Sequence, residues 1–197
     1  MRGDVVAVAA LLVTAACGSS AASAQDGTPP PSAAVQSSQM PRIGDPFTLP
    51  GSNNTGSFRL TVDGVSSTVS PAAVRAYADS LGAMLDTKPD PGHKWVIVAI
   101  HGTNVGDQPA FFLTQFFVLT AGGKQFDVSL SDSKAEHVAD GYNAIKNTTI
   151  SSELNPGQTG FEWVVYQVPK SLPVQSILVG ADGTDGASTV VDLTHHR

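Results

Sequence analysis

Few side chains in this sequence are arranged in a pattern that could support catalysis. The chain of 197 residues has five histidines and one cysteine. None of them stands in a nucleophile elbow, a zinc-protease motif or a glycine-rich phosphate loop. We interpret His101 as a hydrogen-bonded histidine at the end of a strand, because one histidine without a placed partner makes no triad. His93, His137 and the pair at 195–196 lack the further ligands of a closed metal site. The sequence therefore predicts no catalytic residue, no metal site and no cofactor.

Cys17 is the one residue for which the sequence indicates a chemical modification. Residues 1–16 contain an apolar run that is too short to span a bilayer as a helix, which predicts a signal peptide. The segment Thr14–Cys17 resembles the lipobox of bacterial lipoproteins. This resemblance implies cleavage before Cys17, a lipid linked to its thiol, and a location on the extracytoplasmic face of the bacterial cell membrane.

A second cleavage site remains as an alternative. Ala22–Ala24 has the Ala-x-Ala pattern of an ordinary signal-peptidase site, and cleavage after Ala24 would release a secreted protein. We favour the lipobox because the apolar run directly adjoins Cys17.

Composition limits the classes of partner. The formal net charge is −6 and the 11 basic residues are scattered, whereas a nucleic-acid-binding surface needs clustered positive charge. Residues 17–46 are rich in Ser, Ala and Pro, which predicts a flexible tether. Residues 47–194 carry the patterns of a folded domain, and 195–197 form a tail. We therefore expect contact with the membrane through the lipid anchor and none with nucleic acid.

The apolar stretch 94–104 organises the domain. Apolar residues occupy both of its alternating faces, which indicates a central strand buried on both sides. Further strands are predicted at 58–69 with a bulge or bend at Gly64, at 111–119, 125–127, 161–168, 174–181 and 188–193. A short candidate strand lies at 148–154, and 129–147 is expected to be a loop or an irregular edge. The glycine-rich turn 182–186 lacks the ligand spacing of a calcium loop, so we interpret it as a hairpin turn.

The residues after Ser70 predict one helix. Apolar side chains recur at helical spacing from Pro71 to about Asp86, so this helix should cover part of the sheet. About seven strands with one short inserted helix predict a mainly β fold, an antiparallel β-sandwich.

Three landmarks along the chain resemble one family. They are Gly92–Asp107, where the central strand enters an Asn-x-Gly-Asp turn, the hairpin Phe117–Phe126, and Leu154–Pro169 with its Asn-Pro-Gly-Gln turn. Over about residues 56–194 they are similar to the telokin-like, immunoglobulin-like domain-of-unknown-function family of bacterial secreted lipoproteins and actinobacterial secreted antigens. The resemblance implies an immunoglobulin-like sandwich outside the cytoplasmic membrane and no catalytic residues.

Two functions fit these patterns. The first is a non-catalytic protein interaction module that presents edge strands and loops to an unknown envelope or host protein. The alternative is a carrier for a small hydrophobic ligand, motivated by the aromatic run that includes Phe111, Phe112 and Phe116. In that hypothesis the ligand lies between the sheet and the helix, which carries Tyr77 and Leu81. We expect the aromatic run to form a buried strand beside the central one, which favours the interaction module.

Overall fold

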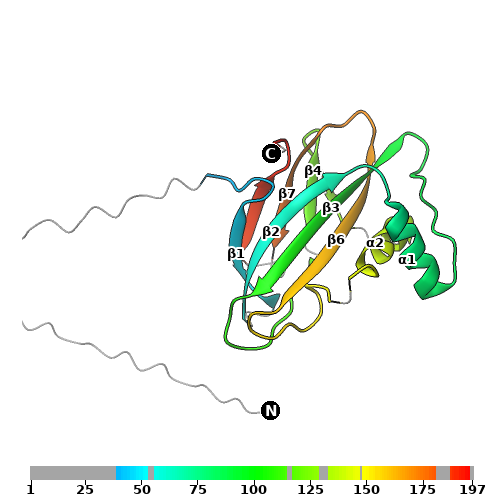
Figure 1. Ribbon diagram of the computed structural model, residues 1–197. Coiled ribbons are helices and arrows are strands. Elements are labelled where there is room, and N and C mark those ends of the chain that lie inside the picture. The colour runs from blue at the N-terminus through cyan, green and yellow to red at the C-terminus, as the bar shows by residue number, and fades with distance from the viewer. Residues whose placement is uncertain are drawn as a thin grey trace, which may run out of the picture. The chain divides into compact units, whose positions relative to one another are not determined.

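Two antiparallel sheets face each other, and two helices lie beside the first sheet (Figure 1). The computed structural model describes residues 39–52, 56–114, 117–128, 133–146, 148–180 and 187–195. The first sheet has the order β1 (Pro46–Pro50), β2 (Ser57–Ser66), β3 (His93–Asn104), β6 (Thr159–Pro169). The second has the order β5 (Lys124–Asp127), β4 (Val118–Ala121), β7 (Val174–Gly180), β8 (Ser188–Asp192). The helices are α1 (Pro71–Leu81) and α2 (Ser133–Asn143). The predicted mainly β sandwich is confirmed, with eight strands among the residues described.

The stretch predicted as the central strand is β3, which pairs with β2 on one side and with β6 on the other. Val96, Val98 and Ile100 face the second sheet, whereas Trp95 and Ile97 face the helices. All five side chains are buried. Because both faces of β3 are covered by apolar layers, the prediction of a strand buried on both sides is confirmed.

The main core fills the space between the two sheets. Its largest fully buried side chains are Phe58, Phe112, Phe117, Leu60, Ile100, Leu119, Ile150, Leu154 and Ile177. The rings of Phe58 and Phe112 meet edge to face with centroids 5.7 Å apart, and Phe117 lies 6.0 Å from Phe112. Burying one such side chain stabilises the fold by about 1.5–3 kcal/mol. The aromatic cluster is therefore a main source of the attraction between the sheets.

The strand predicted at 111–119 is only partly correct. Its last two residues belong to β4, which lies in the second sheet and not beside β3. Upstream, Ala110 and Leu154 exchange backbone hydrogen bonds of 3.0 and 2.8 Å, and the Phe112 N–H donates to the carbonyl of Ile150 at 2.8 Å. Residues 110–112 are thus bonded to the loop at 150–154 and not to β3, and β4 in the second sheet follows from Val118. That loop consists of turns and isolated bridges, so the short strand predicted at 148–154 is wrong.

Helix α1 begins where predicted and ends early. The Ser70 hydroxyl oxygen accepts the N–H of Ala73 at 3.1 Å, and Pro71 occupies the first helical turn. At the other end Gly82 adopts a left-handed φ of 64° and donates its N–H to the carbonyl of Ala78. The predicted extension to residue 86 is wrong, because Gly82 caps the helix instead of continuing it.

Helix α2 lies within residues 129–147, which the sequence predicts as a loop, and that prediction is wrong. The buried residues Ala135, Val138 and Tyr142 recur at helical spacing, but polar residues separate them and weaken the pattern. Gly141 lies against α1, where a Cβ atom would come within 2.8 Å of the carbonyl oxygen of Ala73. Glycine therefore permits the close approach of the two helices.

The helices cover one end of the outer face of the first sheet (Figure 1). The layer between the helices and this sheet is a second core. Its buried members are Ala73, Tyr77, Leu85, Trp95, Ile97, Ala135, Val138, Tyr142 and Val165. The indole N–H of Trp95 donates to the carbonyl of Thr87 at 2.9 Å. Lys134 of α2 forms salt bridges of 2.9 Å with Asp90 and 3.4 Å with Asp86. The loop after α1 is thereby held against both the sheet and α2.

Packing against the sandwich begins before β1. The Asp192 N–H donates to the carbonyl of Pro41 at 2.8 Å, and Ile43 is buried in the main core. These residues belong to the segment 17–46 that the sequence assigns to the tether, so the last part of that segment contacts the domain. Strand β1, which no sequence pattern predicts, then pairs with β2.

Candidate functional site

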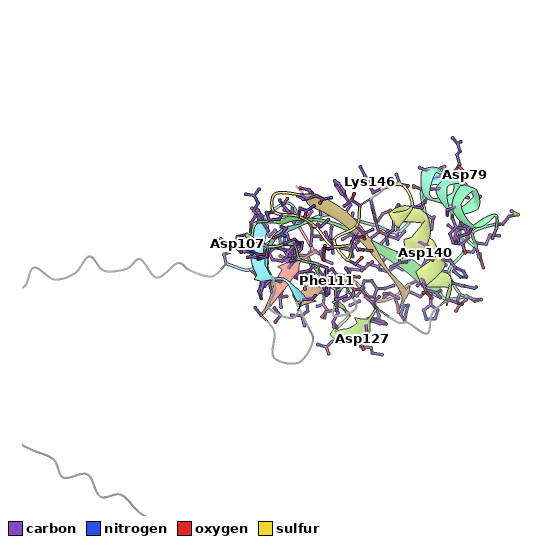
Figure 2. The ribbon with its side chains drawn as sticks, turned by 90° about the horizontal axis from the view of Figure 1, so that it is seen from below. Asp79, Asp107, Phe111, Asp127, Asp140 and Lys146 are labelled. Carbon is purple, nitrogen blue, oxygen red and sulfur yellow. The ribbon has the colours of Figure 1, made fainter. Side chains whose placement is uncertain are left out.

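The structure separates the residues that the sequence grouped as a possible ligand surface. Phe112 is fully buried between the two sheets. Phe111, which Figure 2 labels, is half-buried beside it. Tyr77 is buried in the second core, on the opposite face of the first sheet. Leu81 is 59% exposed at the end of α1. These four residues do not form one surface, and the layer between α1 and the sheet is filled by side chains.

Several sequence expectations lie outside the described residues, namely those on Cys17, Phe116 and the turn 182–186. Within the described ranges, no three or more His, Cys, Asp or Glu side chains are grouped so that they could hold a metal ion. The described helices are also too short or too polar to cross a bilayer.

A β-bulge in β2 places a carboxylate on the outer face of the first sheet. Val62 pairs with Ile100 and Gly64 with Ala99, so Asp63 is an extra residue without a partner in β3. Bulges of this kind change the direction in which a side chain points. Asp63 Oδ1 lies 2.7 Å from His101 Nδ1, and both side chains are partly exposed. The predictions of a bulge at Gly64 and of a hydrogen-bonded His101 are confirmed.

Next to the bulge lies a depression of about 250 Å³, which we call the outer-face groove. Gly64, Ala99 and Trp163 are paired across β2, β3 and β6 and form one row of it. No atom lies within 4 Å of the position that a Cβ on Gly64 would occupy. Two small residues therefore leave the sheet uncovered between Asp63 and the helices.

Two stacked aromatic rings border the groove on the side of the helices. The ring centroids of Tyr142 and Trp163 are 5.8 Å apart, with 27° between the ring planes. The Tyr142 hydroxyl accepts the N–H of Ser70 at 2.7 Å and donates to the carbonyl of Thr68 at 3.2 Å. The backbone N–H of Trp163 donates to the side-chain oxygen of Asn143 at 3.0 Å. The aromatic wall is thus fixed by α2 and by the connection from β2 to α1.

Glu162, the residue before Trp163 in β6, is a buried carboxyl group. Glu162 accepts hydrogen bonds from the Asn143 amide at 2.6 Å and from the Ser151 hydroxyl at 2.8 Å. Burial raises the pKa of Glu162 above its ordinary value, and the hydrogen bonds from Ser151 and Asn143 lower it in part. Because these bonds join the end of α2 to the edge of β6, we assign Glu162 a structural role.

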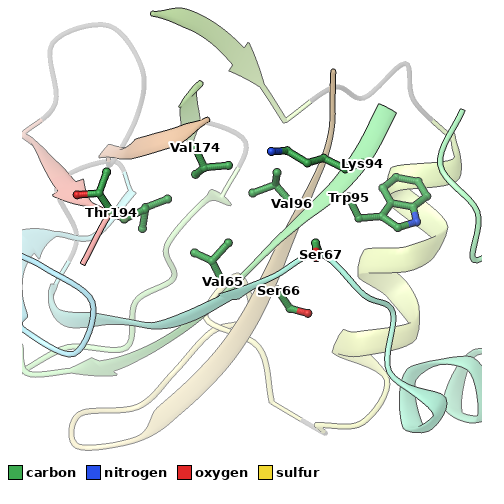
Figure 3. Close-up of a pocket in the computed structure, with 9 residues that line it drawn as sticks. Val65, Ser66, Ser67, Lys94, Trp95, Val96, Val174 and Thr194 are labelled. Atoms are coloured by element: carbon green, nitrogen blue, oxygen red, sulfur yellow. The ribbon is translucent and has the colours of Figure 1, made fainter. Parts of the chain in front are cut away.

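A second depression, of about 430 Å³, opens between the two sheets at the start of β3. Figure 3 shows Val65, Val96 and Val174 around it, with the Lys94 side chain on the same side. The Lys94 ammonium donates to the carbonyl of Leu172 at 2.8 Å. The ammonium of Lys94, the one charged residue in the described lining of this depression, is thus already engaged by the protein.

Two exposed apolar side chains flank Gly82, which caps the C-terminal end of α1. Leu81 is 59% exposed and Met84 is 96% exposed, and we call this pair the α1 tip. Residues 79–90 around them contain three aspartates and one lysine. In Figure 1, α1 lies at the end of the domain opposite β1.

Sequence patterns did not identify Asp63, Tyr142 or Trp163 as members of one site. Gly64 signals the bulge, but only the pairing of β2 with β3 shows that Asp63 is the extra residue. Tyr142 belongs to the helix that the sequence did not reveal.

Comparison with solved structures gives distant similarities. A conserved hypothetical protein from Bacillus anthracis is 17% identical with a TM-score of 0.45, over 75% of this chain and 94% of that chain. A Bacillus subtilis protein described as a "putative lipoprotein (ycdA)" is 14% identical with a TM-score of 0.43, over 70% of this chain and 37% of that chain. The yjhA protein from Bacillus subtilis is 14% identical with a TM-score of 0.43, over 78% of this chain and 99% of that chain.

No curated protein matches the chain. A family model, described as Domain of unknown function (DUF4352), matches residues 53–181. That match includes β2, β3 and the outer-face groove together with both helices. The descriptions of these matches name neither a telokin-like nor an immunoglobulin-like family. Because the model spans more than half of the sequence, the chain belongs to the DUF4352 family of domains of unknown function.

Proposed function

We propose that the protein is a bacterial lipoprotein, held by a lipid on Cys17 at the extracytoplasmic face of the cell membrane. Its telokin-like, immunoglobulin-like domain acts as a non-catalytic protein interaction module. The anchor is supported by the lipobox-like segment Thr14–Cys17 directly behind an apolar run. Two or more acyl chains hold such a protein stably on a membrane, because each buried methylene contributes about 0.8 kcal/mol.

Two matched variants test the anchor. Cys17→Ala removes the thiol that would carry the lipid, so this variant should lose incorporation of a labelled fatty acid and leave the membrane fraction. Ala24→Leu blocks the alternative cleavage site and should behave like the parent protein. If Cys17→Ala remains as firmly bound to the membrane as the parent, the anchor is elsewhere. A mature protein that begins at Gln25 would show that the chain is released.

The interaction module is supported by the α1 tip. Leu81 and Met84 are both exposed at the C-terminal end of α1 and offer hydrocarbon for contact with a partner. The nearby Asp86 and Asp90 are paired with Lys134, so the apolar side chains are the feature of this surface that a partner could use. We infer that the partner is an envelope or host protein with an apolar socket.

A binding measurement tests this surface. Proteins cross-linked in cells through a photoreactive group at position 84 are identified, purified and titrated with the parent protein. The double variant Leu81→Lys, Met84→Lys should bind at least about tenfold more weakly, since burial of one large apolar side chain contributes about 1.5–3 kcal/mol. Val190→Lys is the control, because Val190 is 41% exposed on β8 in the second sheet. Equal affinity of the double variant, or equal loss in both variants, would contradict the proposal.

The alternative function, a carrier for a hydrophobic ligand between helix and sheet, has less support. Tyr77, Trp95, Ile97 and Val165 pack together there. A ligand would have to displace these side chains, at a cost similar to that of opening a cavity in the core.

A further inference from the structure

The outer-face groove combines a single charge with apolar and aromatic surface. Its described lining consists of Asp63, Gly64, Val65, Ser66, Ile97, Ala99, Tyr142 and Trp163. Asp63 is the only one of these residues with a side chain that is charged at neutral pH. A complementary ligand is therefore a cation with apolar substituents.

The groove has few free hydrogen-bonding groups. Asp63 Oδ1 is engaged by His101. The Ser66 hydroxyl accepts the N–H of Thr68 and donates to the carbonyl of the same residue, both at 3.1 Å. The Tyr142 hydroxyl is engaged by Ser70 and Thr68. The contact with His101 uses only Oδ1, so the second carboxylate oxygen of Asp63 is left as an acceptor in the described lining.

This shortage discriminates between classes of ligand. A sugar or a primary ammonium group has several hydroxyl or N–H groups, and the described lining offers few free side-chain acceptors for them. A quaternary ammonium group has no N–H donors and requires only an opposite charge and apolar contact. Aromatic rings attract such cations, with tryptophan the most effective.

The size of the groove agrees with a compact group. Its volume of about 250 Å³ is below the range typical for drug-sized ligands. We propose that the outer-face groove binds a small quaternary ammonium group, held over Gly64 and Ala99 between the Asp63 carboxylate and the Trp163 ring. This site is separate from the α1 tip, so it extends the proposed function and can fail independently of it.

The two tryptophans of the chain give a direct readout. Trp163 lines the groove, whereas Trp95 is buried and its indole N–H is bonded to Thr87. The purified protein is titrated with choline, and the two indole N–H signals are followed by NMR, with Trp163→Phe to assign them. The Trp163 signal should shift in a saturable manner while the Trp95 signal stays in place. No saturable shift of the Trp163 signal would overturn the proposal.

Matched ligands test the role of charge and of the missing N–H donors. The neutral carbon isostere of choline has the same shape without the charge, and ethanolamine has a primary ammonium group. The isostere should bind roughly fivefold more weakly than choline, the factor that one charge pair at contact distance provides in water. Ethanolamine keeps the charge but lacks the methyl groups that would contact the apolar lining, so it should also bind more weakly than choline. Equal binding of the isostere, or tighter binding of ethanolamine or glucose, would overturn the proposal. Competition between choline and phosphatidylcholine vesicles distinguishes a free solute from a lipid headgroup as the source of the group.

Two variants test the location. Gly64→Leu fills the open space above Gly64 and should abolish choline binding, with folding checked by circular dichroism and urea unfolding. Asp63→Asn keeps the shape of the side chain without its charge and should weaken binding roughly fivefold. Val190→Ser, on the second sheet, is the control and should bind choline like the parent. Unchanged binding by a folded Gly64→Leu protein would overturn the proposal.

Discussion

The contact between Asp63 and His101 depends on a single extra residue in β2. On either side of Asp63, Val62 pairs with Ile100 and Gly64 pairs with Ala99. The side chain of Asp63 lies on the outer face of the sheet and reaches His101 Nδ1 at 2.7 Å. Asp63 is the only charged side chain in the described lining of the outer-face groove.

Deletion of Asp63 should therefore be tolerated. Val62 and Gly64 would become neighbours that already pair with consecutive residues of β3, so the register on both sides is preserved. The expected change in the free energy of unfolding is within about 1 kcal/mol, because the lost pair with His101 is partly exposed. Urea denaturation measures it.

Deletion of Thr61 is the matched control. It removes a residue from the regular part of β2 and so moves apolar side chains to the wrong face of the sheet. This variant should lose most of its stability. Similar stability of the two deletion variants would show that the bulge does not set the register.

Substitution of Gly141 should separate the two helices. In Gly141→Ala the new methyl group lies 2.8 Å from the carbonyl oxygen of Ala73, which is backbone and cannot rotate away. Overpacking of this kind costs about 1–3 kcal/mol and outweighs the gain of about 1 kcal/mol in helix propensity. Urea unfolding should show a net loss. Gly64→Ala, where the space is open, should change stability by less than about 1 kcal/mol. A Gly141→Ala protein as stable as the parent would contradict the close contact.

Glu162 should make the parent protein less stable as the pH rises. Burial raises the pKa of its carboxyl group in the folded state above the ordinary value of 4.5. Between these two pKa values the folded protein binds more protons than the unfolded chain, so its contribution to stability is lost as the pH increases. Glu162→Gln cannot ionise, and the Ser151 hydroxyl can reverse its hydrogen bond to accept from the new amide.

The difference between parent and variant is the observable. Urea unfolding at several pH values on both sides of 4.5 should show that Glu162→Gln gains stability relative to the parent as the pH rises. If the parent gains relative to the variant, the carboxylate is stabilised by its hydrogen bonds more than it is penalised by burial.

Asn104 should be intolerant of substitution. Its buried amide donates to the carbonyls of Gln108 and Leu154 at 2.8 Å each and accepts the N–H of Gly106 at 2.9 Å. Asn104→Ala leaves these backbone groups without partners and should reduce the free energy of unfolding by at least about 2 kcal/mol. Thermal and urea denaturation measure this loss.

Asn104→Asp distinguishes hydrogen bonding from packing. The carboxylate keeps the acceptor for Gly106 but faces two carbonyl oxygens, so the variant should be less stable at neutral than at acidic pH. A loss no larger than that of an exposed polar residue would contradict the role assigned to Asn104.

The sequence predicts the elements whose signal is local. Strand β3 is recognised because its apolar residues are contiguous, and the start of α1 because Ser70 and Pro71 are adjacent. Helix α2 escapes detection because only a few buried residues, separated by polar ones, carry its pattern. The path of Phe112 depends on hydrogen bonds to a segment about 40 residues away, which no local pattern encodes.

In the candidate site, too, only the local signals could be predicted from the sequence. Gly64 within the alternating pattern of β2 indicates a bulge, but the partner of Asp63 lies 38 residues further along the chain. The stacking of Trp163 on Tyr142 requires both the register of β6 and the position of α2. The residues that line the outer-face groove are thus brought together by contacts between segments far apart in the sequence, which no local pattern reveals.

The first sheet separates two apolar layers, the main core and the second core under the helices. Each helix lies in a connection between two strands: α1 between β2 and β3, and α2 between β5 and β6. Opening of the helical layer would expose the outer face of β3 and leave the layer between the sheets intact. The domain therefore contains two units of different local stability, and backbone amides of the helices should exchange with solvent before those of β3. A partner at the α1 tip that stabilises the less stable unit would slow exchange there without altering the sandwich.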